Sequence, residues 1–134
     1  MLKCDKLSIT IAGRTLVREL SLELGSGEVI CMLGPNGVGK TLALHTLAGL
    51  LTPASGVVML DGEDISELGR RQIARRLGLL LQDDAESFPA TVLDTVLMGR
   101  HPYMTALGSA SAADRALADQ ALAAMDLGGF SPRT

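Results

Sequence analysis

Alternation of apolar and polar positions dominates the first part of the chain and predicts β-strands there. Residues 7–11, LSITI, alternate, a turn follows at residues 12–14, and residues 15–24 alternate again. A glycine-rich turn at residues 25–27 then precedes the continuous apolar run VICML at residues 29–33. Such runs are typical of central strands that are covered on both faces, so we expect a buried strand here.

The middle of the chain changes from strand to helix patterns. Residues 40–51, KTLALHTLAGLL, have helical spacing, and Pro53 is expected to end that helix. Residues 57–60, VVML, predict a short strand, followed by an Asp-Gly turn. Ser66 is the expected cap of a short helix carrying RRQIARRL, and LGLLLQ, residues 77–82, predicts a second buried strand.

The last third of the chain predicts helices. Residues 91–99, TVLDTVLMG, have helical spacing, and residues 99–108, around Pro102, are expected to be irregular. Residues 111–127 predict the clearest helix, with Ser111 as its cap, Asp114 at the third helical position and Gly128 to end it. Apolar strands mixed with helices indicate the α/β class, with an antiparallel β section at the N-terminus.

Composition and charge limit the function classes. The length of 134 residues suits one domain or part of a larger one, and the 47% of apolar residues supports a substantial core. The net charge of −3 argues against a nucleic-acid partner. Four arginines, at positions 70, 71, 75 and 76, are interpreted as the solvated face of a helix around apolar neighbours.

Cysteine usage and the lack of long apolar stretches indicate a cytosolic protein. Cys4 and Cys31 lie among apolar residues and are expected to be inert core thiols in a reducing compartment. No leader pattern opens the chain, so no signal peptide is expected. No apolar run reaches the roughly 18 residues that a membrane-spanning helix needs, so no insertion into a bilayer is expected.

The strongest chemical signal is the octapeptide GPNGVGKT at residues 34–41, which satisfies the pattern GxxxxGK[ST]. Glycines keep side chains out of a loop whose consecutive backbone N–H groups face one anion, and the following helix adds its N-terminal dipole. Lys40 is expected to reach the β and γ phosphates, and the Thr41 hydroxyl to bind Mg²⁺. The expected nucleotide-binding residues are Gly34, Pro35, Asn36, Gly37, Val38, Gly39, Lys40, Thr41 and Leu42.

A wider resemblance extends over the whole chain. The GPNG form of the loop, the helix end LAGLL, the P-x-S-G turn and the apolar-DG hairpin resemble the ATP-binding subunit of ABC transporters. The resemblance implies a P-loop NTPase with a RecA-like core and an antiparallel β subdomain over residues 1–90. Residues 91–134 would then begin a helical subdomain, and the C-terminal part of the nucleotide-binding domain would be absent.

The same resemblance suggests further roles. Gln82 falls where the family carries a glutamine that contacts Mg²⁺ and water and senses the membrane partner. The stretch GRHP at residues 99–102 resembles ABC ATPases that power import of iron chelates, haem or cobalamin. The family implies ATP and Mg²⁺ as cofactors, a homodimer, permease partners and a location on the inner face of the cell membrane.

The chain also departs from the family pattern. Ile11 stands where the family usually has an aromatic residue that stacks on adenine, and Leu42 where it commonly has a second hydroxyl. The LSGG-type motif, the Walker B aspartate, the catalytic glutamate and the switch histidine lie downstream of the matched region. Asp61, Asp83 and Asp84 are poor Walker B candidates, since a glycine follows Asp61 and Gln82 ends the strand before the other two.

Three hypotheses remain open on these grounds. The first is an ATPase subunit of an ABC importer, represented by its N-terminal portion. The second is a truncated nucleotide-binding module without turnover, because residues that orient the attacking water are missing. The third, another P-loop NTPase such as a GTPase or kinase, has less support because no NKxD-type guanine motif occurs.

Overall fold

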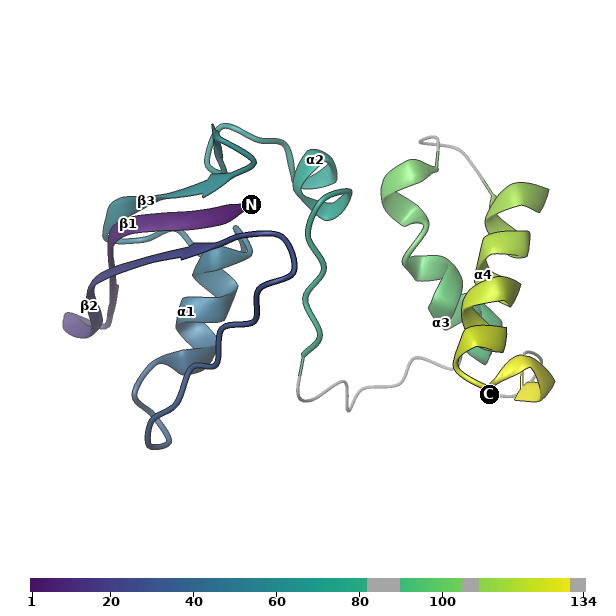
Figure 1. Cartoon of the computed structure of the whole chain (residues 1–134), viewed down its shortest axis with the longest axis horizontal. Coiled ribbons are helices and arrows are strands. Elements are labelled where there is room, and N and C mark those ends of the chain that lie inside the picture. The colour runs from purple at the N-terminus through teal and green to yellow at the C-terminus, as the bar shows by residue number, and fades with distance from the viewer. Residues whose placement is uncertain (82–89, 105–108, 131–134) are drawn as a thin grey trace. The chain divides into compact units, whose positions relative to one another are not determined.

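The computed structural model describes residues 1–81, 90–104 and 109–130. The chain divides into two compact units, Met1–Leu79 and Leu80–Thr134. Figure 1 shows strands and the helices α1 and α2 in the first unit, and helices alone in the second. Within the described ranges, every helix is too short or too polar to pass through a bilayer.

An antiparallel sheet forms the first unit, as the N-terminal alternation predicts. Its four strands run in the order β2-β1-β3-β4, and every neighbouring pair is antiparallel. The β1–β2 turn has positive φ at both central residues, Ala12 and Gly13, which suits the twist of a tight hairpin. The strands are β1 Leu2–Ile11, β2 Arg14–Leu24, β3 Ser55–Leu60 and β4 Glu63–Asp64.

Helix α1, Lys40–Leu47, packs its buried face against this sheet (Figure 1). The helix ends well before Pro53, which corrects the expectation that the proline stops it. Gly49, with φ 72°, takes the left-handed position after the helix, and the N–H of Leu50 donates to the carbonyl of His45 at 2.9 Å. This is a Schellman ending, which satisfies carbonyls of the last turn. The core shared by sheet and helices comprises Cys4, Leu7, Ile9, Ala43, Leu47, Val58, Leu60, Ile65 and Ile73.

Helix α2, Arg70–Ala74, is shorter than expected and begins at a different residue. Its N-cap is Gly69, whose N–H donates to the Gln72 side chain at 2.9 Å. Ser66 instead closes a turn with its hydroxyl and backbone N–H on one oxygen of Asp64, at 2.7 and 2.9 Å. The predicted Ser66 cap is therefore wrong, because this hydroxyl is already bonded to the preceding turn.

The two buried strands expected at residues 29–33 and 77–82 do not form within the described residues. Val29 and Leu33 are 94% and 86% exposed, and Leu80 is 92% exposed. A continuous apolar run becomes a central strand only when neighbours pair with both of its edges, and no described residue pairs with these segments. Cys31 is consequently exposed, contrary to expectation, whereas Cys4 is buried in the core and burial raises the pKa of its thiol.

The second unit contains the two predicted helices, and both are capped. In α3, Val92–Met98, the Thr91 hydroxyl accepts from Asp94 N–H, and in α4, Ala112–Ala124, Ser111 does the same for Asp114. Short 3₁₀ turns lie at His101–Tyr103 and Gly128–Phe130. Helix α4 ends at Ala124 and not at Gly128, because Asp126 with φ 58° already takes the left-handed position.

Arg100 ties the end of α3 to the start of α4. Its Nε donates to Asp114 at 2.9 Å, and its guanidinium lies 4.2 Å from the centre of the Tyr103 ring. Asp114 also accepts from the Ser111 hydroxyl at 2.6 Å, so one carboxylate serves both the cap and the ion pair. Within this unit, Arg100 of the stretch GRHP is therefore held in place by its ion pair with Asp114 and its contact with the Tyr103 ring.

Candidate functional site

The predicted phosphate loop is a largely exposed segment whose last two residues, Lys40 and Thr41, are the first two of α1. Gly39 is the N-cap of α1, and no side chain there accepts a hydrogen bond from the first turn. The first hydrogen bond of the helix runs from Ala43 N–H to the Gly39 carbonyl at 2.8 Å. The N–H groups before Ala43 are therefore available, together with the positive end of the helix dipole, to an anion at this end of α1.

Two loop positions require glycine for different physical reasons. Gly37, with φ 78°, has open space where a Cβ would stand, so its requirement is conformational. Gly39 has φ 105°, and its Cβ would lie only 3.2 Å from a methyl of Val17 and 3.4 Å from Cβ of Leu16. The second glycine therefore also allows the start of α1 to approach strand β2.

Lys40 bends back over the loop. Its Nζ donates to the carbonyls of Gly34 and Pro35, at 2.7 and 2.8 Å. Both partners are uncharged, and within the described ranges no carboxylate forms an ion pair with this ammonium. A positive charge that is hydrogen-bonded but not neutralised therefore stands beside a set of free N–H donors.

The structure places some of the remaining predicted residues at the loop, but not all of them. Thr41 is exposed in the first turn of α1, while Leu42 packs its side chain against the core and leaves only its backbone N–H for a ligand. Pro35, Asn36 and Val38 are exposed on the loop. Gln82 lies outside the described residues, as do Asp83 and Asp84, so the structure does not place them relative to the loop.

A cavity of about 280 Å³ adjoins the loop, and sequence reasoning did not find it. Strand β2 forms one wall with Leu16, Val17, Arg18 and Leu20, and the opposite lining is Met32, Leu33, Val38, Gly39, Lys40 and Ala43. Ile11, expected to cover the base, does not line this cavity and is 46% exposed at the end of β1. The cavity depends on contact between segments about twenty residues apart, which alternation within each segment does not reveal.

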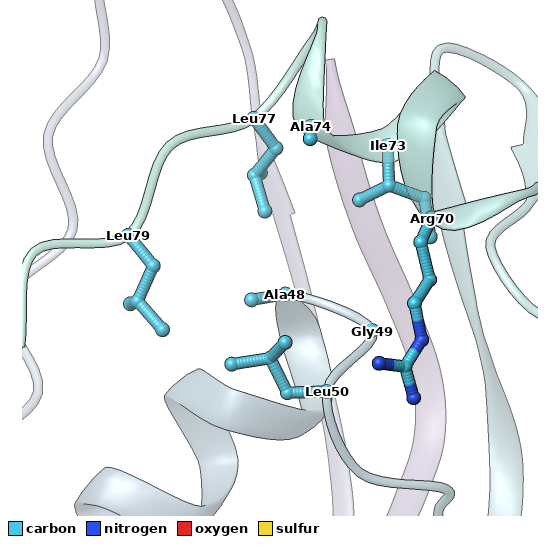
Figure 2. A pocket seen from close by; sticks show the side chains of 8 residues that line it. All are labelled: Ala48, Gly49, Leu50, Arg70, Ile73, Ala74, Leu77 and Leu79. Carbon is cyan, nitrogen blue, oxygen red and sulfur yellow. The ribbon is translucent and has the colours of Figure 1, made fainter. Parts of the chain in front are cut away.

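A second cavity of about 240 Å³ lies between the end of α1 and the α2 segment (Figure 2). Figure 2 shows Ile73, Leu77 and Leu79 on one side and Leu50 on the other, with the Arg70 guanidinium beside Gly49. Apart from this one exposed guanidinium, no charged or hydrogen-bonding side chain lines the space. It is not a candidate phosphate or catalytic site, because such sites need several converging polar groups.

Asp61, rejected as a Walker B residue, has another role in the structure. It lies in the β3–β4 turn with φ 52°, next to Gly62 with φ 86°. Its carboxylate accepts from the amine of Met1 at 2.7 Å, and this hydrogen bond and charge lower its pKa. The residue therefore belongs to a turn and a terminal ion pair, as the Asp-Gly turn signal predicts.

Comparison with known proteins gives the family. Residues 17–134 match the description of the ABC transporter family. The chain belongs to the ABC transporter family. This confirms the resemblance that the loop, the helix end and the two turns suggest, and it rests on most of the chain and not on the octapeptide alone.

Individual ABC relatives include several import ATP-binding proteins. The chain is 41% identical over 133 residues to the hemin import ATP-binding protein HmuV of Rhizobium meliloti, covering 99% of this chain and 49% of that protein. It is 34% identical over 127 residues to the cobalamin import ATP-binding protein BtuD of Halobacterium salinarum, covering 95% of this chain and 31% of that protein. The chain thus spans half or less of the length of these curated relatives.

Solved ABC structures confirm the fold class. A chain from an inward-facing ABC transporter of the metal-chelate type matches with a TM-score of 0.79 and 25% identity, covering 98% of this chain and 47% of that one. A dimeric ATP-binding cassette, MJ0796 bound to ADP and phosphate, matches with a TM-score of 0.77 and 20% identity, covering 98% and 60%. The chain has the ABC ATPase fold, with its antiparallel β section and helices, over about half of such a domain.

Proposed function

We propose that this chain is the N-terminal portion of the ATP-binding subunit of an ABC importer, and that residues 34–42 bind ATP. The observation that carries the proposal is the loop itself. Free N–H groups at the start of α1 lie beside the Lys40 ammonium, whose hydrogen-bond acceptors are two neutral carbonyl groups. A polyphosphate offers both groups the anionic oxygen acceptors that they lack.

Nucleotide binding would exchange the hydrogen-bond partners of the Lys40 ammonium. Its ammonium leaves the carbonyls of Gly34 and Pro35 and donates to the phosphates, replacing two neutral hydrogen bonds by charge-assisted ones. Gly37 and Gly39 keep side chains away from the loop, so backbone N–H groups approach the phosphate oxygens closely. Leu42 would donate only its backbone N–H to a phosphate oxygen, because its side chain packs against the core.

The residues present suit Mg²⁺ as the companion ion. Thr41 exposes a hydroxyl oxygen in the first turn of α1, beside the expected phosphate position, and hard divalent cations prefer oxygen ligands. Gln82 would supply a second oxygen, on the strength of the family resemblance. When bound, the ion neutralises charge on the β and γ phosphate oxygens.

The names of the relatives support a proposal on partners and cargo. Because relatives are named as hemin import, cobalamin import and ferric enterobactin transport ATP-binding proteins, we place the intact protein as a homodimer under a permease on the inner face of the membrane. The cargo would be an iron chelate, haem or cobalamin. Within the chain, residues 1–90 would form the β subdomain and P-loop core, and residues 91–134 the start of the helical subdomain.

A second candidate is a module that binds nucleotide without turning it over. The groups that the described residues supply at the loop are backbone N–H donors and the Lys40 ammonium, which suit phosphate binding. The loop by itself supplies phosphate binding, whereas hydrolysis also needs a group that orients the attacking water. Release of phosphate by the isolated chain, abolished by Lys40→Ala, would exclude this second candidate.

The decisive experiment is a calorimetric titration of Mg·ATP into the chain, its Lys40→Ala variant and a Lys3→Ala control. Lys3 is a lysine of β1 whose ammonium pairs with Glu23 on the surface at 3.1 Å. We expect binding by the parent and the control, and at least about tenfold weaker binding by Lys40→Ala, which loses a charge-assisted contact. Equal binding by all three, or none by a parent whose circular dichroism shows it folded, would contradict the proposal.

A further inference from the structure

A third cavity, of about 320 Å³, lies in the first unit and shares no residue with the phosphate loop. Its lining comes from three places in the chain: the end of α1, residues 51–58 that lead into β3, and residues 64–66 after the β3–β4 turn. Ligand pockets in proteins begin at about 300 Å³, so this volume suits one small molecule.

The deep part of this lining is apolar. Val58 and Ile65 are 2% and 8% exposed and belong to the buried core of the unit. Leu51, Pro53 and Val57 line the cavity as half-buried side chains. A ring or short alkyl group placed against these residues would leave water, and that transfer favours binding.

The polar part of the lining offers acceptors. Thr46 donates its hydroxyl hydrogen to the carbonyl of Leu42 at 2.7 Å, and Ser66 donates its hydroxyl hydrogen to Oδ1 of Asp64 at 2.7 Å. A hydroxyl has one hydrogen and two lone pairs, so both groups can only accept from a ligand. Among the described residues, the hydrogen bonds to the Asp64 carboxylate reach Oδ1 alone, which leaves Oδ2 as a further acceptor.

The charge of the cavity is negative. Of the described side chains that line it, Asp64 alone is ionisable, and within the described ranges no basic group forms an ion pair with this carboxylate. Hydrogen bonds from the hydroxyl and then the N–H of Ser66 hold the pKa of Asp64 below its ordinary value of 3.8. The half-buried carboxylate is therefore ionised at neutral pH.

We infer that this cavity binds a small organic cation, with its ammonium group on Oδ2 of Asp64 and its apolar body against Val58 and Ile65. An ammonium brings three donors and a positive charge to a lining that supplies acceptors and a negative charge. An anion of the same size would meet repulsion from Asp64, and a neutral molecule would lack the charge-assisted contact. The site is independent of the phosphate loop, so its failure would leave the proposed function untouched.

The test is an NMR titration of the ¹⁵N-labelled chain with benzylamine, methylamine, benzyl alcohol and benzoate. We expect benzylamine to shift the amide signals of the residues that line the cavity. Methylamine, which has no ring to bury, should bind at least about tenfold more weakly, and benzyl alcohol, which has no charge, about threefold more weakly. Benzoate should cause no shifts there. The inference would be overturned by benzyl alcohol or benzoate binding as tightly as benzylamine, or by benzylamine shifting no signal of the lining.

A matched pair of variants tests the carboxylate. Asp64→Asn removes the charge and keeps an oxygen that can accept from Ser66, whereas Glu67→Gln removes the same charge from an exposed side chain outside the cavity. Asp64→Asn should weaken benzylamine about threefold and leave benzyl alcohol unchanged, and Glu67→Gln should change neither. Equal losses of benzylamine binding in both variants, or none in Asp64→Asn, would contradict the inference. The comparison of benzylamine with benzyl alcohol on the parent decides the role of charge even where Asp64→Asn alters the turn.

Discussion

Gly56 and Gly62 share a left-handed backbone, with φ of 85° and 86°, but differ in their surroundings. A Cβ on Gly56 would overlap the Lys6 carbonyl and lie 2.6 Å from the Asp5 carbonyl in the neighbouring strand β1. A Cβ on Gly62, in the β3–β4 turn, would meet nothing within 4 Å. Glycine is therefore required at position 62 by conformation alone, and at position 56 also by the close approach of strands β1 and β3.

This pair predicts two different losses of stability. Gly62→Ala should lower the free energy of unfolding by about 1–2 kcal/mol, the cost of a left-handed alanine. Gly56→Ala should cost about 1–3 kcal/mol more, since β1 and β3 must move apart to admit a methyl group. Urea unfolding followed by circular dichroism measures both, and equal losses would show that the β1–β3 contact is looser than the structure has it.

Residue-level patterns predict a phosphate loop because all its parts are consecutive. Gly34 and Gly37 are needed for their backbone conformation, and the Lys40 side chain folds back onto carbonyls of the same loop, so the spacing of these residues contains the geometry. The contact of Gly39 with Leu16 and Val17 joins segments far apart in the sequence, and no local pattern predicts it. The expectation that Ile11 covers the base rests on the family resemblance alone and stays a prediction.

Helix α4 shows how one carboxylate supports an element. Hydrogen bonds from the Ser111 hydroxyl, then from Arg100 and from Ser111 N–H, hold the pKa of Asp114 below its ordinary value of 3.8. A lowered folded-state pKa means that the carboxylate stabilises the fold fully above about pH 4. That contribution is lost as the pH falls through the folded-state pKa.

We therefore expect Asp114→Asn to lower the melting temperature at pH 7 and to narrow the difference between pH 7 and pH 3. Asp119→Asn is the control, because Asp119 is an exposed carboxylate of the same helix with no hydrogen-bond partner among the described residues. Thermal unfolding by circular dichroism at several pH values measures both variants. The same pH dependence in Asp114→Asn as in the parent would contradict this role of the capping carboxylate.

The beginnings of the two helices in the second unit were predicted well, whereas the beginning of α2 and the ends of α1 and α4 were not. The helix expected from Thr91 and the cap expected at Ser111 are both found, because each start is set by contacts within four residues. Helix α1 ends at the left-handed Gly49 before Pro53 is reached, and α4 ends at Asp126, where a left-handed conformation is uncommon. Both ends depend on local backbone conformations that several residues along the segment could have adopted.

The first unit presents an uncovered apolar surface on its extended segment 28–33. Val29 and Leu33 are 94% and 86% exposed, and no described strand pairs with residues 29–33. Exposed apolar segments with free backbone groups favour association between chains. We therefore expect the isolated chain to associate as its concentration rises.

Two substitutions separate apolar contact from charge. Val29→Lys removes an exposed apolar side chain and adds one positive charge, whereas Ser26→Lys adds the same charge in the neighbouring turn and removes no apolar surface. Sedimentation velocity over a concentration series should show less association for Val29→Lys than for the parent, and no change for Ser26→Lys. Equal sedimentation of all three chains at every concentration would contradict this interpretation of the segment.

Over the whole molecule, the sequence by itself determined the antiparallel hairpin, the Ser111 cap of α4 and the family, and it predicts the phosphate loop. These depend on residues close in the chain, whose spacing sets backbone conformation and hydrogen bonds directly. The tertiary structure decided which apolar segments are covered, since burial of residues 29–33 requires partners on both sides. It also decided that Leu16 and Val17 adjoin the loop, because only packing of α1 against β2 brings these segments together.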